Sequence, residues 1–195
     1  MLPLSLFYSY PVMRQFLDGM NNMDNHFRNE KDTRKNLPLL LALVGWYNTF
    51  ICEYNMRAII PYSQGLMRFA AHMQQVDTES NGKSTSLDGA LLDYECGPMV
   101  VGEPGTNAQH SFFQLLHQGR VIPIEFIGFA KSQTPIHQAS EIVSNHDELM
   151  SNFFAQPDAL ALGKDLEQLE KEGVPEHLRA HKLFSGDRPS LSLLF

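Results

Sequence analysis

The sequence predicts an α/β fold in which helices flank a layered, mixed β-sheet. Stretches whose apolar residues recur at spacings of three and four alternate along the chain with short, partly β-branched apolar runs. This alternation favours layers of helix and sheet over a bundle or a sandwich. The chain has 195 residues, of which 43% are hydrophobic and 19% are charged. A chain of this length and composition can bury a sizeable core, which excludes a disordered protein.

Helices are expected to dominate the first part of the chain. Apolar residues follow one helical face over residues 10–27, with a break expected near Gly19. Residues 37–51 are apolar nearly all round, which predicts a buried helix. The next expected elements are a strand over residues 57–61, which a proline ends, and a helical stretch over residues 62–74.

Loops are expected over residues 76–105, which are rich in Gly, Ser, Asp and Pro, with short strands near Leu91 and over residues 99–101. Helices and strands then alternate to the end of the chain. They are a helix over residues 107–118, a buried strand over 121–129, a helix over 144–162 that Pro157 kinks or breaks, a short charged helix over 166–171, and a strand-type run over 189–195.

Charge and cysteine content exclude several classes of function. Asp and Glu outnumber Lys and Arg by 22 to 15, a formal net charge of -7, so no nucleic-acid or anionic membrane partner is expected. The longest apolar stretch, residues 37–44, is too short to span a bilayer. Cys52 and Cys96 form no CxxC or Cys/His pattern, which argues against a disulfide scaffold or a zinc module and favours a reducing, cytoplasmic compartment.

A turn followed by a helix start makes one histidine a candidate for proton exchange. Residues 102–110, GEPGTNAQH, combine a rigid Gly-Pro-Gly turn with a capping-box pattern formed by Thr106 and Gln109. His110 is therefore expected in the first turn of a helix, where the dipole disfavours the imidazolium form and keeps a neutral imidazole available. The alternative is a histidine that only packs or meets solvent.

The loop that carries Glu79 holds the second candidate. A carboxylate in a crowded, partly dry pocket can act as a general base, whereas an exposed one would not. The segment SNGKS resembles the end of a phosphate-binding loop, but Asp77 occupies the position of the first glycine that such a loop requires. His72, Asp77 and Glu79 have the chemistry of metal ligands, yet their spacing does not fix them on one helix face, so no metal is expected.

Four segments of the sequence closely resemble the phosphoglucose isomerase family, also called glucose-6-phosphate isomerase. They are QQVDTESNGK (74–83), GEPGTNAQHSFFQLLHQG (102–119), SNHDELMSNFFAQPDAL (144–160) and HKLFSGDRPSLSLLF (181–195). The resemblance extends over essentially the whole chain and is greatest to the cytosolic, plant-like branch. It implies a cytoplasmic protein.

The resemblance also implies an activity and a set of residues. The family interconverts glucose 6-phosphate and fructose 6-phosphate, a step of glycolysis and gluconeogenesis, without a metal or organic cofactor. Glu79 would be the base that moves a proton between the first two sugar carbons through an enediol, and Gln75 would contact the substrate. His110, 31 residues after Glu79, would assist ring opening. The family is a dimer in which this histidine enters the neighbouring subunit's site, so a homodimer is expected.

The resemblance assigns residues 1–195 to the second sugar-isomerase domain of such an enzyme, truncated and incomplete at both ends. We expect the first domain with its phosphate-binding residues, the C-terminal tail, an arginine that stabilises the enediolate and a lysine that assists the histidine to be absent. Thr78 and Ala108 replace the family's common methionine and glycine. The isolated chain is therefore expected to have little or no activity. The alternatives are a non-catalytic folding or dimerisation segment and a metal-dependent sugar isomerase.

Overall fold

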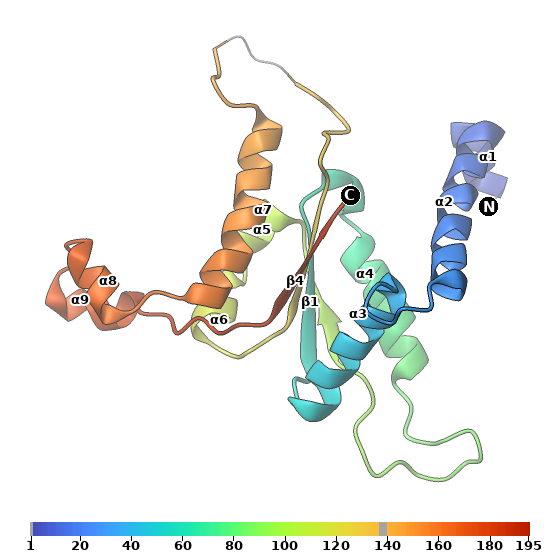
Figure 1. Cartoon of the computed structure of the whole chain (residues 1–195), viewed down its shortest axis with the longest axis horizontal. Coiled ribbons are helices and arrows are strands. Elements are labelled where there is room, and N and C mark those ends of the chain that lie inside the picture. The colour runs from blue at the N-terminus through green and yellow to red at the C-terminus, as the bar shows by residue number, and fades with distance from the viewer. Residues whose placement is uncertain (1, 137–139) are drawn as a thin grey trace. The chain divides into compact units, whose positions relative to one another are not determined.

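The computed structural model describes residues 2–136 and 140–195, and the chain divides into two compact units, Met1–Cys52 and Glu53–Phe195 (Figure 1). The first unit is helical and the second contains the sheet. The assignment of all 195 residues to one sugar-isomerase domain stays a prediction.

Within residues 2–52, the first unit consists of three helices and a π-helical turn. Their bounds are α1 (Leu2–Tyr8), α2 (Tyr10–Asn29), α3 (Leu37–Trp46) and the turn Tyr47–Ile51. α2 confirms the helix predicted over residues 10–27, but it runs through Gly19 without the expected break. Gly19 faces open space, and a glycine inside a helix costs only about 1 kcal/mol relative to alanine.

Asn36 is the N-cap of α3 and joins this helix to the end of α2. Its side-chain oxygen accepts a hydrogen bond from the Leu39 N–H at 3.2 Å, and its Nδ2 donates to the carbonyls of Phe27 and Glu30 at 2.9 and 3.1 Å. Asn36 is only 3% exposed, so these bonds satisfy an amide that water does not reach.

The buried helix predicted over residues 37–51 is helical but not buried. Trp46, Tyr47 and Ile51 are 54%, 53% and 55% exposed. Among the described residues of the first unit, Met13 is the one buried hydrophobic side chain. An apolar composition shows that these side chains would be stabilised by burial. Burial also requires a second surface packed against them, which the segment itself does not contain.

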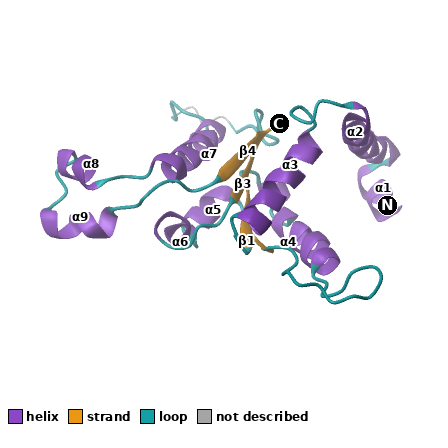
Figure 2. Cartoon of the chain, turned by 60° about the horizontal axis from the view of Figure 1, so that its bottom comes forward, coloured by secondary structure: helices purple, strands orange, loops and turns teal. Residues whose placement is uncertain are grey.

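Among the described residues, a four-stranded sheet forms the centre of the second unit (Figure 2). Its strands are β1 (Met56–Pro61), β2 (Met99–Val101), β3 (Ile124–Gly128) and β4 (Ser190–Leu194), in the order β2-β1-β3-β4. All three strand pairs are parallel. The α/β class is confirmed, and the expected mixed sheet is parallel instead, because helices rather than hairpins connect successive strands.

Helices cover both faces of this sheet (Figure 1). On one face, Ala70 packs with Ile59, Val100 and Ile127, and on the other the core gathers around Phe126. The first face is covered by α4 (Phe69–Gln74), which follows the 3-10 turn Gln64–Leu66, and the second by α5 (Gly105–Gln109), α6 (Phe113–Gln118) and α7 (Asn145–Leu162).

α7 is a single helix of 18 residues. Ser144 caps it, since its Oγ accepts a hydrogen bond from the Asp147 N–H at 3.1 Å. Pro157, which was expected to kink or break the helix, lies inside it. Phe153 and Leu160, at 1% and 0% exposure, lie on either side of Pro157 in the same core. Their burial holds both halves of α7 against the sheet.

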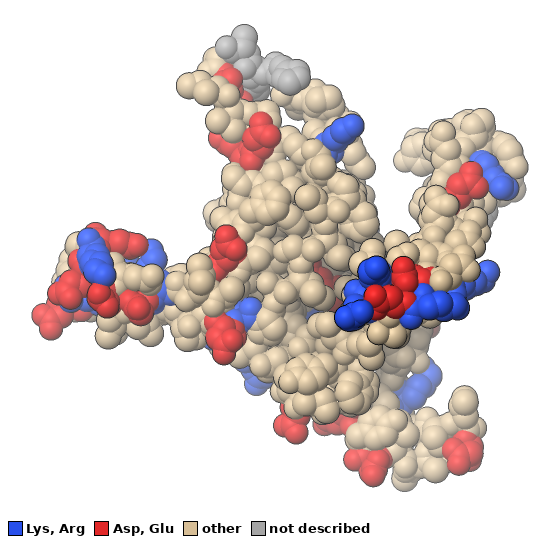
Figure 3. Space-filling view, in the orientation of Figure 1, with Lys and Arg blue, Asp and Glu red and all other residues tan. Residues whose placement is uncertain are grey.

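A small charged pair of helices precedes β4. α8 (Leu166–Lys171) confirms the predicted charged helix, and a reciprocal capping box of Asp165 and Gln168 begins it. α9 (Glu176–Lys182) was not predicted. Figure 3 shows basic and acidic groups mixed on this pair. The ion pairs are Lys164–Glu172, Lys171–Glu167 and Arg179–Glu170.

Candidate functional site

Glu79 is the last residue of a π-helical turn, Gln75–Glu79, that continues α4. A loop was predicted here, so this prediction is wrong. Glu79 and Gln75 are both exposed. Side chains four residues apart in a helical segment project from the same side of it. π-helical turns inside helices are frequent at functional sites. The local structure therefore presents Gln75 and Glu79 to solvent together.

Gly82 closes the turn that carries Glu79. Its N–H donates to the Thr78 carbonyl at 2.9 Å, and a Cβ at this position would lie 2.5 Å from that oxygen. Lys83 donates from Nζ to the carbonyl oxygen of Glu79. Because a side chain at position 82 would collide with the backbone, the segment ESNGK needs its glycine to hold this shape.

Two contacts tie the turn to the sheet. Gln74 donates from Nε2 to the Val100 carbonyl of β2 at 2.9 Å. Asp77, in the middle of the turn, pairs with Arg57 of β1, with 3.0 Å between Oδ2 and Nη2. Arg57 in turn pairs with Glu125 of β3, with 3.5 Å between Nη1 and Oε1. Three strands therefore fix the position of the turn.

Sequence reasoning missed Arg57 and Glu125. Both are charged residues inside apolar strands, in MRAIIP and IEFIG, and that pattern is the signal that could have found them. Only 21% and 22% of their side chains are exposed. Charged groups buried to this extent are normally paired, and pairing is what the structure shows.

Burial raises the pKa of Glu125 above its ordinary value. The guanidinium of Arg57 opposes this rise, and the carboxylate of Asp77 adds to it. Because the net effect is a raised pKa, the folded chain binds this proton more tightly than the unfolded chain does.

The free energy of unfolding should therefore depend on pH through Glu125. Its contribution is most favourable below the ordinary pKa of 4.5, declines as the pH rises through the raised pKa, and is constant above it. Urea unfolding of the chain and of its Glu125→Gln variant over a pH series checks this. As the pH rises across that window, the glutamine variant is expected to gain stability relative to the unmutated chain. A stability difference that does not change with pH would contradict this role of Glu125.

His110 follows the last residue of α5 and does not lie in the first turn of a helix, so that prediction is wrong. The single helix expected over residues 107–118 is two helices, α5 and α6. α5 already begins at Gly105, with Pro104 as an N-cap that supplies no side-chain bond. The helix-dipole argument for a neutral imidazole therefore does not apply to His110, whose side chain is exposed.

A contact with Tyr62 explains why α5 begins early. Gln109, expected to cap the helix with Thr106, instead donates from Nε2 to the Tyr62 hydroxyl at 2.8 Å. A Cβ at Gly105 would lie 2.5 Å from the Tyr62 ring, so this glycine lets the helix start directly against it. Burial raises the pKa of Tyr62 to about 12, although the bond from Gln109 opposes the rise, and the phenol stays protonated.

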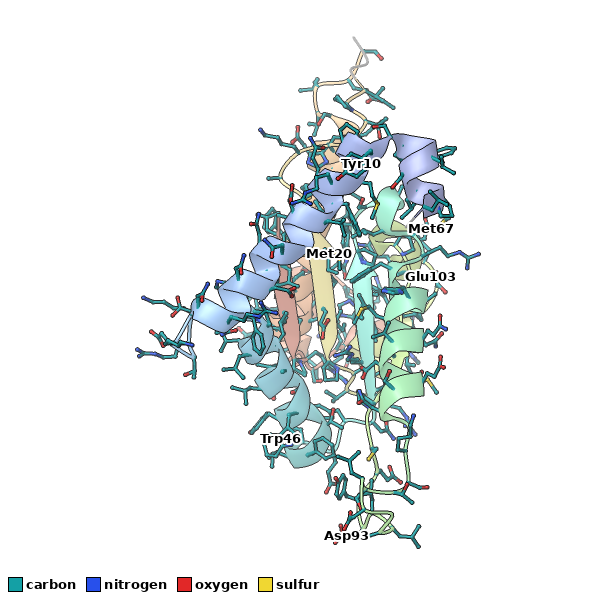
Figure 4. The ribbon with its side chains drawn as sticks, turned by 90° about the vertical axis from the view of Figure 1, so that its right-hand side faces the viewer. Tyr10, Met20, Trp46, Met67, Asp93 and Glu103 are labelled. Carbon is teal, nitrogen blue, oxygen red and sulfur yellow. The ribbon has the colours of Figure 1, made fainter. Side chains whose placement is uncertain are left out.

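Within one chain, Glu79 and His110 lie on elements that cover opposite faces of the sheet. The turn carrying Glu79 continues α4, whereas His110 follows α5, and the two helices belong to different core clusters. Figure 4 shows α4 running from Met67 near one end of the strands towards the loop of Asp93 beyond the other, with Glu103 near the Met67 end. α5 starts at Gly105, two residues after Glu103. The structure does not bring Glu79 and His110 into one pocket.

The structure also bears on the possible metal ligands, the two cysteines and the membrane. Among residues 2–136 and 140–195, no group of three or more His, Cys, Asp or Glu side chains is arranged to hold a metal ion. Asp77, considered as a metal ligand, pairs with Arg57. Cys52 and Cys96 are free thiols. None of the described helices is long and apolar enough to cross a membrane.

A model of the phosphoglucose isomerase family matches residues 1–195. Because the match covers the chain from end to end, the chain belongs to the phosphoglucose isomerase family. The family resemblance inferred from the sequence is confirmed.

Two similar plant proteins carry the name of the enzyme of this family. The chain is 60% identical over 193 residues to "Glucose-6-phosphate isomerase, cytosolic B" of Oryza sativa subsp. japonica and 58% identical over 193 residues to the cytosolic enzyme of Spinacia oleracea. Each match covers 99% of this chain and 34% of the relative. The chain thus spans about a third of the length of these curated relatives.

Solved structures support the same fold. A glucose-6-phosphate isomerase from Chlamydia trachomatis superposes with a TM-score of 0.82 at 40% identity, covering 95% of this chain and 34% of that one. A hypothetical protein from Thermus thermophilus superposes with a TM-score of 0.57 over 91% of this chain and 38% of that one. At 20% identity, this second likeness supports the fold alone.

Proposed function

We propose that this chain supplies catalytic residues to a cytosolic aldose-ketose isomerase that interconverts glucose 6-phosphate and fructose 6-phosphate. Family membership over the whole chain supports this, as do relatives named cytosolic glucose-6-phosphate isomerase. The observation that carries the proposal is the turn Gln75–Glu79, which two contacts anchor to the sheet. Glu79 is exposed in this chain, and we assign the crowded, partly dry pocket that a general base needs to the part of the relatives' length that this chain does not match. A general base must reach the substrate carbon while its own backbone is held in place.

Glu79 acts first as a base and then as an acid. Its carboxylate removes the proton from C2 of the open-chain aldose, the C2 electrons form the double bond of an enediol, and the carbonyl oxygen at C1 gains a proton. The protonated Glu79 then returns its proton to C1 as the C2 oxygen becomes a carbonyl and loses its hydrogen. Gln75 contacts the sugar through its amide. The conversion is redox-neutral, so no electron-accepting cofactor is needed.

His110 assists ring opening by exchanging a proton with the sugar. Because α5 and the Glu79 turn cover opposite faces of the sheet, we place this histidine in the site of a second copy, which makes a homodimer the working unit. Its exposed position at the end of α5 supports this arrangement, since a residue donated to a neighbour must lie on the surface of its own chain.

The 195-residue chain alone is expected to have little or no activity. The enediolate needs positive charge placed around it, and the substrate phosphate needs a binding pocket. We assign both to the part of the relatives' length that this chain does not match.

A graft tests the proposed function. This chain replaces the matching segment of the rice cytosolic isomerase, and conversion of fructose 6-phosphate to glucose 6-phosphate is measured with a coupled dehydrogenase. We expect the graft to turn over at a rate comparable to the rice enzyme and the chain alone to show little turnover. A well-folded graft without turnover would favour the alternative, a non-catalytic folding or dimerisation segment.

A further inference from the structure

The turn that carries Glu79 is attached to the sheet at two different points. Gln74, directly before Gln75, is bonded to the backbone of β2. Asp77, two residues before Glu79, is bonded to the side chain of Arg57. The first attachment holds the beginning of the turn, and the second holds its middle, two residues before Glu79.

Asp77 uses both of its carboxylate oxygens to organise this segment. Oδ2 pairs with Arg57 at 3.0 Å, and Oδ1 accepts a hydrogen bond from Asn81 Nδ2. Asn81 follows Glu79 by two residues, so the same carboxylate joins the sheet to residues on both sides of Glu79. A movement of Asp77 therefore moves the backbone of Glu79.

Arg57 is suited to this place by its shape and its charge. Its planar guanidinium donates in two directions, to Asp77 at 3.0 Å and to Glu125 at 3.5 Å. The Nε of Arg57 is buried. Without the guanidinium, two partly buried carboxylates, 16% and 22% exposed, would face each other and repel. That repulsion would push the turn away from β3.

We propose that Arg57 is a positioning residue that holds Glu79 in place through Asp77, an inference that rests on the proposed function. Arg57 does not touch the substrate. Its loss lowers kcat more than it raises KM, because the attachment beside Gln75 runs through Gln74 and β2 and does not involve Arg57.

The test uses the graft into the rice isomerase with three variants. Arg57→Ala removes the guanidinium, and Asp77→Asn keeps the size of the side chain while removing its charge. Arg179→Ala is the control, because Arg179 on α9 is 24% exposed and pairs with Glu170 at 3.0 Å, which matches the exposure and pairing distance of Arg57. Glu170, at 64% exposure, is more exposed than Asp77. Each variant is assayed for kcat and KM, with and without millimolar methylguanidinium.

We expect kcat to fall about 10- to 100-fold in Arg57→Ala, since small misplacements of a reacting group cost rates of this order. KM should change little, and Asp77→Asn should behave similarly. Methylguanidinium should restore part of the kcat of Arg57→Ala but not of Asp77→Asn, which no general loss of stability would reproduce. Equal kcat values for Arg57→Ala and Arg179→Ala in an active graft would overturn this inference alone. An inactive unmutated graft would overturn the proposed function and this inference with it.

Discussion

Replacing Glu79 with glutamine in the graft is expected to lower kcat by about 10²- to 10⁴-fold, the usual contribution of a general base. Glutamine has nearly the same size but cannot accept the carbon-bound proton. The side chain is exposed, so the substitution should not disturb the core, and KM should change far less than kcat. The coupled assay for glucose 6-phosphate checks both parameters.

Two further proteins separate catalysis from other effects of this substitution. Glu176→Gln changes an exposed glutamate in the first turn of α9 and should leave kcat unchanged. A mixture of Glu79→Gln and His110→Ala subunits should regain part of the lost activity, because a mixed dimer keeps one site in which both residues are intact. Full activity in Glu79→Gln would exclude Glu79 as the base, and a mixture no more active than its components would place both residues in one subunit's site.

Replacing Phe153 with alanine is expected to destabilise the chain by about 3–5 kcal/mol, the usual cost of removing a buried phenylalanine. Phe153 is 1% exposed and meets the Tyr62 ring edge-on, with 5.7 Å between centroids. Gly128 at the end of β3 leaves room for it, since a Cβ there would lie 2.9 Å from the Phe153 ring. Urea unfolding followed by far-ultraviolet circular dichroism measures the loss.

Phe154 is the matched control for this substitution. It is the next residue of α7 and is 54% exposed, so Phe154→Ala should change the unfolding free energy by only about 0.5 kcal/mol. Equal losses for the two variants would show that Phe153 does not anchor α7 to the sheet.

The strands were predictable because each is a short apolar run. Residues 57–61 became β1, residues 121–129 contain β3, and residues 99–101 are β2. These runs carry the preference for extended structure locally, so no knowledge of their neighbours was needed. The exposure of residues 37–51, which were expected to be buried, was not predictable in this way, since burial depends on a second surface.

The candidate site was predictable only in part. Glu79 and Gln75 were identified from the family resemblance of the segment that contains them, but the helical turn that presents them together was not predicted, since a loop was expected there. The helix start at Gly105 could not be predicted, because the capping pattern of Thr106 and Gln109 lost to a bond between Gln109 and Tyr62, 47 residues away. Whether Glu79 and His110 carry the reaction stays a prediction for the assays above.

By itself, the sequence determined the family, the α/β class and the segment that contains Glu79, because these depend on local patterns and on runs of residues that resemble the family. Only the tertiary structure decided that Glu79 and His110 lie on elements of opposite faces, and that Arg57 joins Asp77 to Glu125. The pairing of β1 with β3 sets Ile59 opposite Glu125 and thereby brings Arg57 within reach of a carboxylate far along the chain. Such contacts arise from strand register and helix packing, which no short stretch of sequence contains.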